Sequence, residues 1–149
     1  MLMFERFSDP ARRVIFFARY EASQFRSPAI DTVHLLLGML RESHQLITLL
    51  AGSDAVKGLM DRIRQESPVG KEKISLSADL PVSEAAIRVL QSTAEEADQL
   101  GSRTIKPEHL LLGLFRDADT LAARILQETG LDYVGVRKRL EGIESSHPG

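Results

Sequence analysis

His34-Leu35-Leu36-Leu37-Gly38 occurs twice in this chain, the second time as His109-Leu110-Leu111-Leu112-Gly113. The copies lie 75 residues apart in a chain of 149, which they divide into nearly equal halves. Placing residues 8–42 on residues 83–117 without gaps gives 15 identities in 35 positions. The identical residues of the first half are Ser8, Ala11, Arg13, Val14, Glu21, Ala22, Gln24, Ser27, Ile30, His34, Leu35, Leu36, Leu37, Gly38 and Arg41. We therefore predict a duplicated structural unit.

The composition excludes several classes of function. Hydrophobic residues make up 43% of the chain and charged residues 27%, with a formal net charge of −2, so nothing favours nucleic acid or an anionic membrane as the main partner. Without cysteine, disulfide and thiol chemistry are excluded, and a metal site would need His and carboxylates alone. The sequence contains neither a phosphate-binding glycine loop nor a Gly-x-Ser-x-Gly elbow, so we expect no cofactor.

The chain shows no targeting or membrane segment. Residues 1–7 are too short and too charged for a signal peptide. No apolar run approaches the roughly 20 residues that cross a bilayer. We therefore expect a soluble cytoplasmic protein, and a monomer.

The first half predicts four helices. Ser8 or Asp9 can cap a helix that runs to Phe25, with Pro10 in its first turn. An apolar stripe follows helical spacing in this segment, at Ala11, Val14, Ala18, Ala22 and Phe25, and Phe16, Phe17 and Tyr20 broaden it beyond one face. The next three helices are expected from Asp31 or Thr32 to Arg41, from Gln45 to Ala51, and from a Ser53 cap to Glu66. Three consecutive leucines indicate that the second is buried nearly all round.

The second half predicts the same series. Its helices are expected from a Ser83 cap to Leu100, from Pro107 to Arg116, from an Asp119 cap to Glu128, and from an Asp132 cap to Ile143, with Gly101 ending the first of them. Residues 144–149 read as a frayed tail. The fold class is all-α, eight helices as two four-helix repeats with pseudo-twofold symmetry, in one domain over 1–149. Repeat one covers about 8–66, a linker about 67–81, and repeat two about 82–143.

Two kinds of residue could carry chemistry. His34 and His109 could be metal ligands or bases, but their position at a helix start favours a structural hydrogen bond to the preceding loop. The adjacent acids Glu95 and Glu96 read as a solvated helix face.

The starts of the helices are the remaining candidates. Free amides and a serine hydroxyl there can bind an anion, and Ser8 and Ser83 occupy equivalent starts. Both could equally be plain caps. Glu108 precedes the second motif histidine, whereas the equivalent residue of the first half is Val33.

The repeated blocks resemble a known family. Met3-Phe4-Glu5-Arg6-Phe7-Ser8, together with residues 30–38 and 105–113, resembles the Clp N-terminal (double Clp-N) domain of AAA+ unfoldases, most closely the ClpC and ClpA type. The resemblance covers about residues 3–143. It implies an eight-helix domain without catalysis that binds adaptors and substrates. The AAA+ ATPase modules are missing from these 149 residues, so we expect either a stand-alone Clp-N protein or part of a longer chaperone.

The resemblance also implies a ligand. In ClpC-type members, two sites bind phosphorylated arginine through a Thr at the first-helix start and the Glu before the motif histidine. By position, Ser83 and Glu108 keep one such site, and Ser8 keeps half of the other, which has Val33 in place of the Glu. A carboxylate can pair the guanidinium while amides and hydroxyl hold the phosphate.

Three hypotheses about function follow. The first is a non-catalytic module that recognises adaptors or substrates of a Clp ATPase/protease system. An alternative is a structural accessory subunit that docks on a Clp protease complex. The third is a small enzyme or metal protein that uses His34 and His109.

Overall fold

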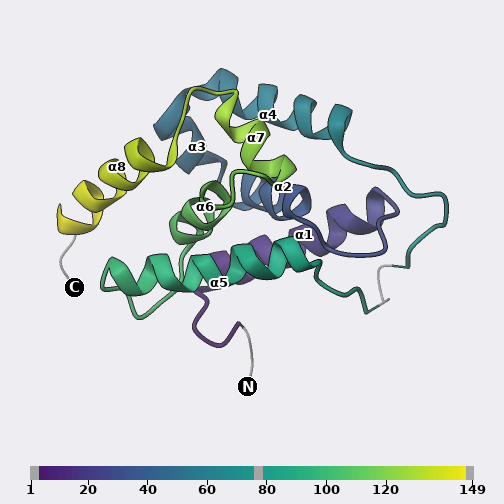
Figure 1. Cartoon of the computed structure of the whole chain (residues 1–149), viewed down its shortest axis with the longest axis horizontal. Coiled ribbons are helices and arrows are strands. Elements are labelled where there is room, and N and C mark those ends of the chain that lie inside the picture. The colour runs from purple at the N-terminus through teal and green to yellow at the C-terminus, as the bar shows by residue number, and fades with distance from the viewer. Residues whose placement is uncertain (1–3, 76–78, 147–149) are drawn as a thin grey trace.

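The computed structural model describes residues 4–75 and 79–146, and the described residues form eight helices without a β-sheet (Figure 1). The helices are α1 (Asp9–Gln24), α2 (Thr32–Glu42), α3 (His44–Ala51), α4 (Ser53–Glu66), α5 (Glu84–Gln99), α6 (Pro107–Arg116), α7 (Leu121–Gln127) and α8 (Tyr133–Ser146). The all-α class and the helix count predicted from the sequence are confirmed. Within the described residues, no helix combines the length and the apolar character needed to cross a bilayer.

The first helix of each repeat begins as predicted. The hydroxyl oxygen of Ser8 accepts a hydrogen bond from the Ala11 N–H at 3.2 Å, and that of Ser83 accepts one from the Ala86 N–H at 3.1 Å. Each serine therefore satisfies one of the amides that a helix leaves free in its first turn. After α5, Gly101 has a φ of +73°. This left-handed conformation often ends a helix, and glycine adopts it without the steric penalty of a Cβ.

The two leucine helices lie at the centre of the molecule, where α2 and α6 are surrounded by the other helices (Figure 1). All residues of α2 from Thr32 to Leu40 are buried, and so are the leucines of the second block in α6. The prediction of buried leucine helices is confirmed. Gly38 lets α2 approach the backbone of α1, since a Cβ at this position would lie 2.3 Å from the carbonyl oxygen of Val14.

The shorter helices differ from the predictions at their caps. Ser53 is the first residue of α4 and makes no capping hydrogen bond; Gly52, with a φ of +93°, precedes the helix instead. Thr120, not Asp119, caps α7, because its hydroxyl accepts the Ala123 N–H at 3.1 Å. Both predictions were wrong by one residue, since an adjacent residue suited to a cap, glycine at α4 and threonine at α7, took the position.

The last helix is longer than predicted. Asp132 caps α8 as expected, accepting the Gly135 N–H at 2.7 Å. The helix continues to Ser146 rather than ending near Ile143, so residues 144–146 of the predicted frayed tail are helical backbone. Residues 147–149 of that tail lie outside the described residues.

Pairs of equivalent contacts relate the two repeats. We call the residue 75 positions later the twin of a residue in the first repeat. Phe7 pairs with Ile105 in a single parallel bridge, and Ile30 pairs with Val82 in another. Val82 is the twin of Phe7, and Ile105 is the twin of Ile30. The two bridges are therefore one contact repeated with the halves exchanged, as pseudo-twofold symmetry requires.

The connection between the repeats contacts the end of α1. The Gly70 N–H donates to the Phe25 carbonyl at 2.9 Å, and the Arg26 guanidinium donates to the Lys71 carbonyl at 3.2 Å. A Cβ at Gly70 would lie 1.9 Å from the Arg26 carbonyl oxygen, so this approach requires glycine. Gly70 and Lys71 thus contact the residues that follow α1, and the Pro81 carbonyl accepts the Ile30 N–H at 2.8 Å; residues 76–78 are outside the described residues.

Candidate functional site

The start of α1 meets the start of α6 in what we call the Ser8 junction. The Ser8 N–H donates to the Ile105 carbonyl at 2.9 Å, which brings Ser8 beside Lys106 and the first turn of α6. Glu108 lies in that turn, half-buried, and its carboxylate has no hydrogen-bond or ion-pair partner among the described residues. Lys106 precedes α6 and is exposed. Its ammonium group is only a donor, so it cannot accept hydrogen bonds from the free N–H groups at the start of α6. The junction therefore combines a hydroxyl, an ammonium group and an unpaired carboxylate.

The equivalent contact between α5 and α2, the Ser83 junction, has different chemistry. The Ser83 N–H donates to the Ile30 carbonyl at 2.9 Å. The Ser83 hydroxyl donates to the Asp31 carboxylate at 2.9 Å, and the same carboxylate oxygen accepts the Thr32 N–H at 2.8 Å. Val33 is buried. An internal carboxylate thus already occupies the position beside the serine, and it would repel a second anion.

The structure does not bring Ser83 and Glu108 together. α5 and α6 are antiparallel, because Arg88 near the start of α5 pairs with Asp117 just after α6 at 3.3 Å. Ser83 and Glu108 therefore lie at opposite ends of α5, whose 16 residues span about 24 Å. The structure instead places Ser8, from the other repeat, beside the first turn of the helix that carries Glu108.

The motif histidines have a structural role. Nδ1 of His34 accepts the Asp31 N–H, and Nδ1 of His109 accepts the Lys106 N–H, both at 2.9 Å. The predicted hydrogen bond to the preceding loop is confirmed in both copies. Burial lowers the pKa of His34 to about 4, against the opposing charge of Asp31, so this ring is neutral. In the described part of the chain, no group of three or more His, Asp or Glu side chains could hold a metal ion.

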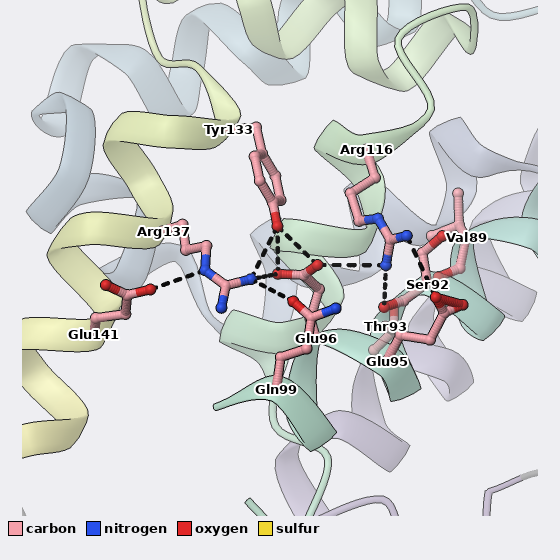
Figure 2. Close-up of polar contacts among 10 residues, drawn as sticks. All are labelled: Val89, Ser92, Thr93, Glu95, Glu96, Gln99, Arg116, Tyr133, Arg137 and Glu141. Carbon is pink, nitrogen blue, oxygen red and sulfur yellow. Dashed lines mark hydrogen bonds and ion pairs between the residues drawn. The ribbon is translucent and has the colours of Figure 1, made fainter. Parts of the chain in front are cut away.

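Glu96 is buried rather than solvated, which corrects the sequence-based reading of the acid pair (Figure 2). Its carboxylate accepts the Tyr133 hydroxyl at 2.8 Å to one oxygen and 2.9 Å to the other. Arg137 of α8 pairs with it at 3.1 Å, and Arg116 of α6 at 3.3 Å. Only Glu95 is exposed, as expected. We call Glu96, Arg116, Tyr133 and Arg137 the Glu96 cluster.

The Glu96 cluster holds α8 against α5 and α6. In Figure 2, Tyr133 and Arg137 reach the carboxylate from α8, and Arg116 reaches it from the other side. Burial, and then the neighbouring carboxylate, raise the pKa of the Tyr133 hydroxyl, although Arg137 opposes the shift. Three side chains bind the buried carboxylate, so the arrangement is suited to a structural role.

The first repeat contains the same buried ion pair. Glu21, the twin of Glu96, is buried and accepts from Arg41 at 2.7 Å. The guanidinium of Arg41 also lies 5.0 Å from the centre of the Tyr20 ring and 5.7 Å from that of Phe17. The repeated acid and arginine were a sequence signal for this contact, since Glu21 and Arg41 both recur 75 residues later.

Comparison with known proteins identifies relatives over nearly the whole chain. The family model for the Clp repeat (R) N-terminal domain matches residues 6–144. An ATP-dependent Clp protease ATP-binding subunit ClpA homolog of Guillardia theta is 36% identical over 138 residues, which are 93% of this chain and 17% of that protein. The chloroplastic chaperone protein ClpC of Pisum sativum is 34% identical over 138 residues, 93% of this chain and 15% of that protein.

A solved structure agrees with these relatives. The N-terminal domain of the caseinolytic protease associated chaperone ClpD from Arabidopsis thaliana superimposes with a TM-score of 0.69 at 30% identity. The alignment covers 94% of this chain and 97% of that domain. In contrast, the chain spans only about one sixth of the length of the ClpA and ClpC relatives.

Proposed function

The chain belongs to the Clp repeat N-terminal domain family, and we propose that it is a non-catalytic module that binds adaptors or substrates of a Clp ATPase and protease system. Membership supports the proposal, since the matched relatives include an ATP-binding subunit of a Clp protease and a Clp chaperone. The polar groups at the Ser8 junction support the binding role too, because a hydroxyl, an ammonium group and a carboxylate can bind a charged ligand.

The Ser8 junction is the proposed ligand site, and phosphorylated arginine is the proposed ligand. The hydroxyl of Ser8 accepts the Ala11 N–H, and its own hydrogen has no acceptor among the described residues. That hydrogen and the Lys106 ammonium group can contact the phosphate, while the Glu108 carboxylate can pair the guanidinium. The unpaired, half-buried carboxylate of Glu108 is the observation that carries the proposal. Ser83 lacks this capacity because Asp31 already accepts its hydroxyl.

Isothermal titration with free phosphoarginine tests the site. Wild type should bind with one-to-one stoichiometry, and Glu108→Ala and Ser8→Ala should each weaken binding by about tenfold or more. Ser83→Ala is the matched control, since it removes the same group from the equivalent helix start, and it should leave the affinity unchanged. Equal affinity in wild type and Glu108→Ala, or loss of binding in Ser83→Ala alone, would contradict the assignment.

Affinity capture from the native cell extract tests the wider role. The proposal expects adaptors or client proteins to be recovered, and expects fewer of them with Glu108→Ala. Recovery of protease core subunits without adaptors or clients would instead indicate an accessory subunit that docks on the protease.

A further inference from the structure

The outward face of α1 carries aromatic side chains that its twin helix lacks. Phe16 is 67% exposed, and its ring lies edge-on to that of Phe17 with centroids 5.6 Å apart. Tyr20 follows one turn later. The twins of these three residues in α5 are Gln91, Ser92 and Glu95. Because α1 and α5 fill the same place in their repeats, the fold itself does not require aromatic residues here.

Arginines surround the exposed ring. Arg12, Arg13 and Arg19 stand four residues before, three before and three after Phe16, so all three lie on its face of the helix. Arg41 of α2 adds a guanidinium over Phe17 and Tyr20. We call this set the Phe16 surface: Arg12, Arg13, Phe16, Phe17, Arg19, Tyr20 and Arg41. Aromatic residues and arginine are the types that dominate the binding energy of protein interfaces.

The charge of this surface selects among partners. Arg13 is paired with Glu42 at 2.8 Å and Arg41 with Glu21 at 2.7 Å, so both are neutralised. Arg12 instead donates to the neutral carbonyl of Glu5 at 3.2 Å and keeps its charge. The twin of Arg12 is Ile87, so the uncompensated charge, like the aromatic ring, belongs to this copy alone.

Other occupants fit less well. Nucleic acid needs several unpaired cations along its backbone, whereas two of these arginines are neutralised and the chain has a net charge of −2. A second copy related by a twofold axis would place this positive face against itself. A partner with carboxylates beside an apolar side chain can pack that side chain against Phe16 and pair a carboxylate with Arg12.

We propose that the Phe16 surface binds an acidic segment of a partner protein, with an aromatic or aliphatic side chain against Phe16 and carboxylates beside Arg12. Eight residues of helix, about 12 Å, separate Phe16 from Ser8, so its ring lies outside the Ser8 junction, whereas Arg12 stands one turn from Ser8. The inference goes beyond the proposed phosphoarginine site, and either can fail without the other.

Selection from a phage-displayed library of random dodecapeptides tests this proposal. Wild-type protein should enrich peptides with Asp or Glu next to Phe, Leu or Ile. Phe16→Gln, which installs the residue of the twin position, should weaken the selected peptides by about tenfold or more in fluorescence anisotropy. Arg12→Ala should weaken them less, and should reduce their dependence on salt. Gln91→Ala on α5 is the matched control and should have no effect.

Several outcomes would overturn the proposal. Enriched peptides without acidic residues, or peptides that bind Phe16→Gln as tightly as wild type, would refute it. So would tighter binding of a single-stranded oligonucleotide than of the selected peptides. A wild-type dimer in light scattering that Phe16→Gln converts to monomer would assign the surface to a second copy instead. Circular dichroism of Phe16→Gln should match wild type, because α5 already carries Gln at this position.

Discussion

Replacing Gly38 by alanine should destabilise the protein, although alanine is the better helix former. The new Cβ would lie 2.3 Å from the Val14 carbonyl oxygen and 2.9 Å from the Ala18 nitrogen, both backbone atoms of α1. Ordinary contact begins at 3.4 Å, so α1 and α2 must separate by about 1 Å at their crossing. Overpacking of a core costs about 1–3 kcal/mol, and backbone atoms cannot rotate away, so the upper end applies. The helix propensity of alanine offsets about 1 kcal/mol, which leaves a net loss of about 2 kcal/mol.

Thermal and urea unfolding followed by circular dichroism would measure this loss. For a chain of this size, about 2 kcal/mol lowers the Tm by about 4–8 °C. Gly58→Ala is the matched control, because Gly58 lies inside α4 and a Cβ there meets no atom within 4 Å. It should stabilise by about 0.5–1 kcal/mol. If Gly38→Ala were as stable as Gly58→Ala, the close approach of α1 and α2 would not be the reason for glycine in the repeated motif.

Two further predictions concern buried polar groups. Glu96→Gln should lower the free energy of unfolding by about 2–3 kcal/mol, since it breaks a buried ion pair whose arginines can still reach water. Glu95→Gln changes the exposed neighbour and should lower it by less than about 0.5 kcal/mol. Equal urea midpoints for these two variants would contradict the role of the Glu96 cluster. The pKa of His34, lowered to about 4, means that only the unfolded chain binds this proton at mildly acidic pH, so its contribution is complete above about pH 6.5 and lost as pH falls to about 4. Wild type should therefore lose up to about 3 kcal/mol more than His34→Gln over that range, and parallel stability curves for the two proteins would refute the assignment.

Local signals in the sequence were sufficient to predict the helices. Ser8 and Ser83 cap helices because each precedes an apolar stripe, and the structure places both hydroxyls on the expected amides. The errors at Ser53 and Asp119 arose where two adjacent residues could serve. A difference of one residue in a cap costs little energy, so composition alone does not decide it.

Burial of Glu96 could not be predicted from its neighbours in the chain. Two of the partners that make burial tolerable, Tyr133 and Arg137, follow it by 37 and 41 residues in α8. An acid beside another acid on a helix reads as solvated unless those partners are known. The twin pair of Glu21 and Arg41 was the available clue, because two separate copies rarely keep an acid and an arginine on an exposed face without a reason.

The placement of the candidate site depended on topology. Ser83 and Glu108 belong to the same repeat, so pairing them assumed that each repeat builds its own site. The parallel bridges instead exchange the halves, so that Ser8 of the first repeat meets the helix of the second. No local pattern shows whether a duplicated unit closes on itself or on its copy, since the spacing along the chain is identical in both cases.

Differences between the two copies are therefore a better guide to function than the identities. The identical positions, such as Gly38 and its twin, lie where the two repeats need the same packing. Each of the proposed sites contains a residue that differs between the copies. The twin of Val33 is Glu108, and the twin of Phe16 is Gln91. Since both copies experience the same fold, a polar or aromatic residue found in only one is not explained by packing common to both. Phe16→Gln tests this reasoning directly, because it installs a residue that the same fold already tolerates 75 positions away.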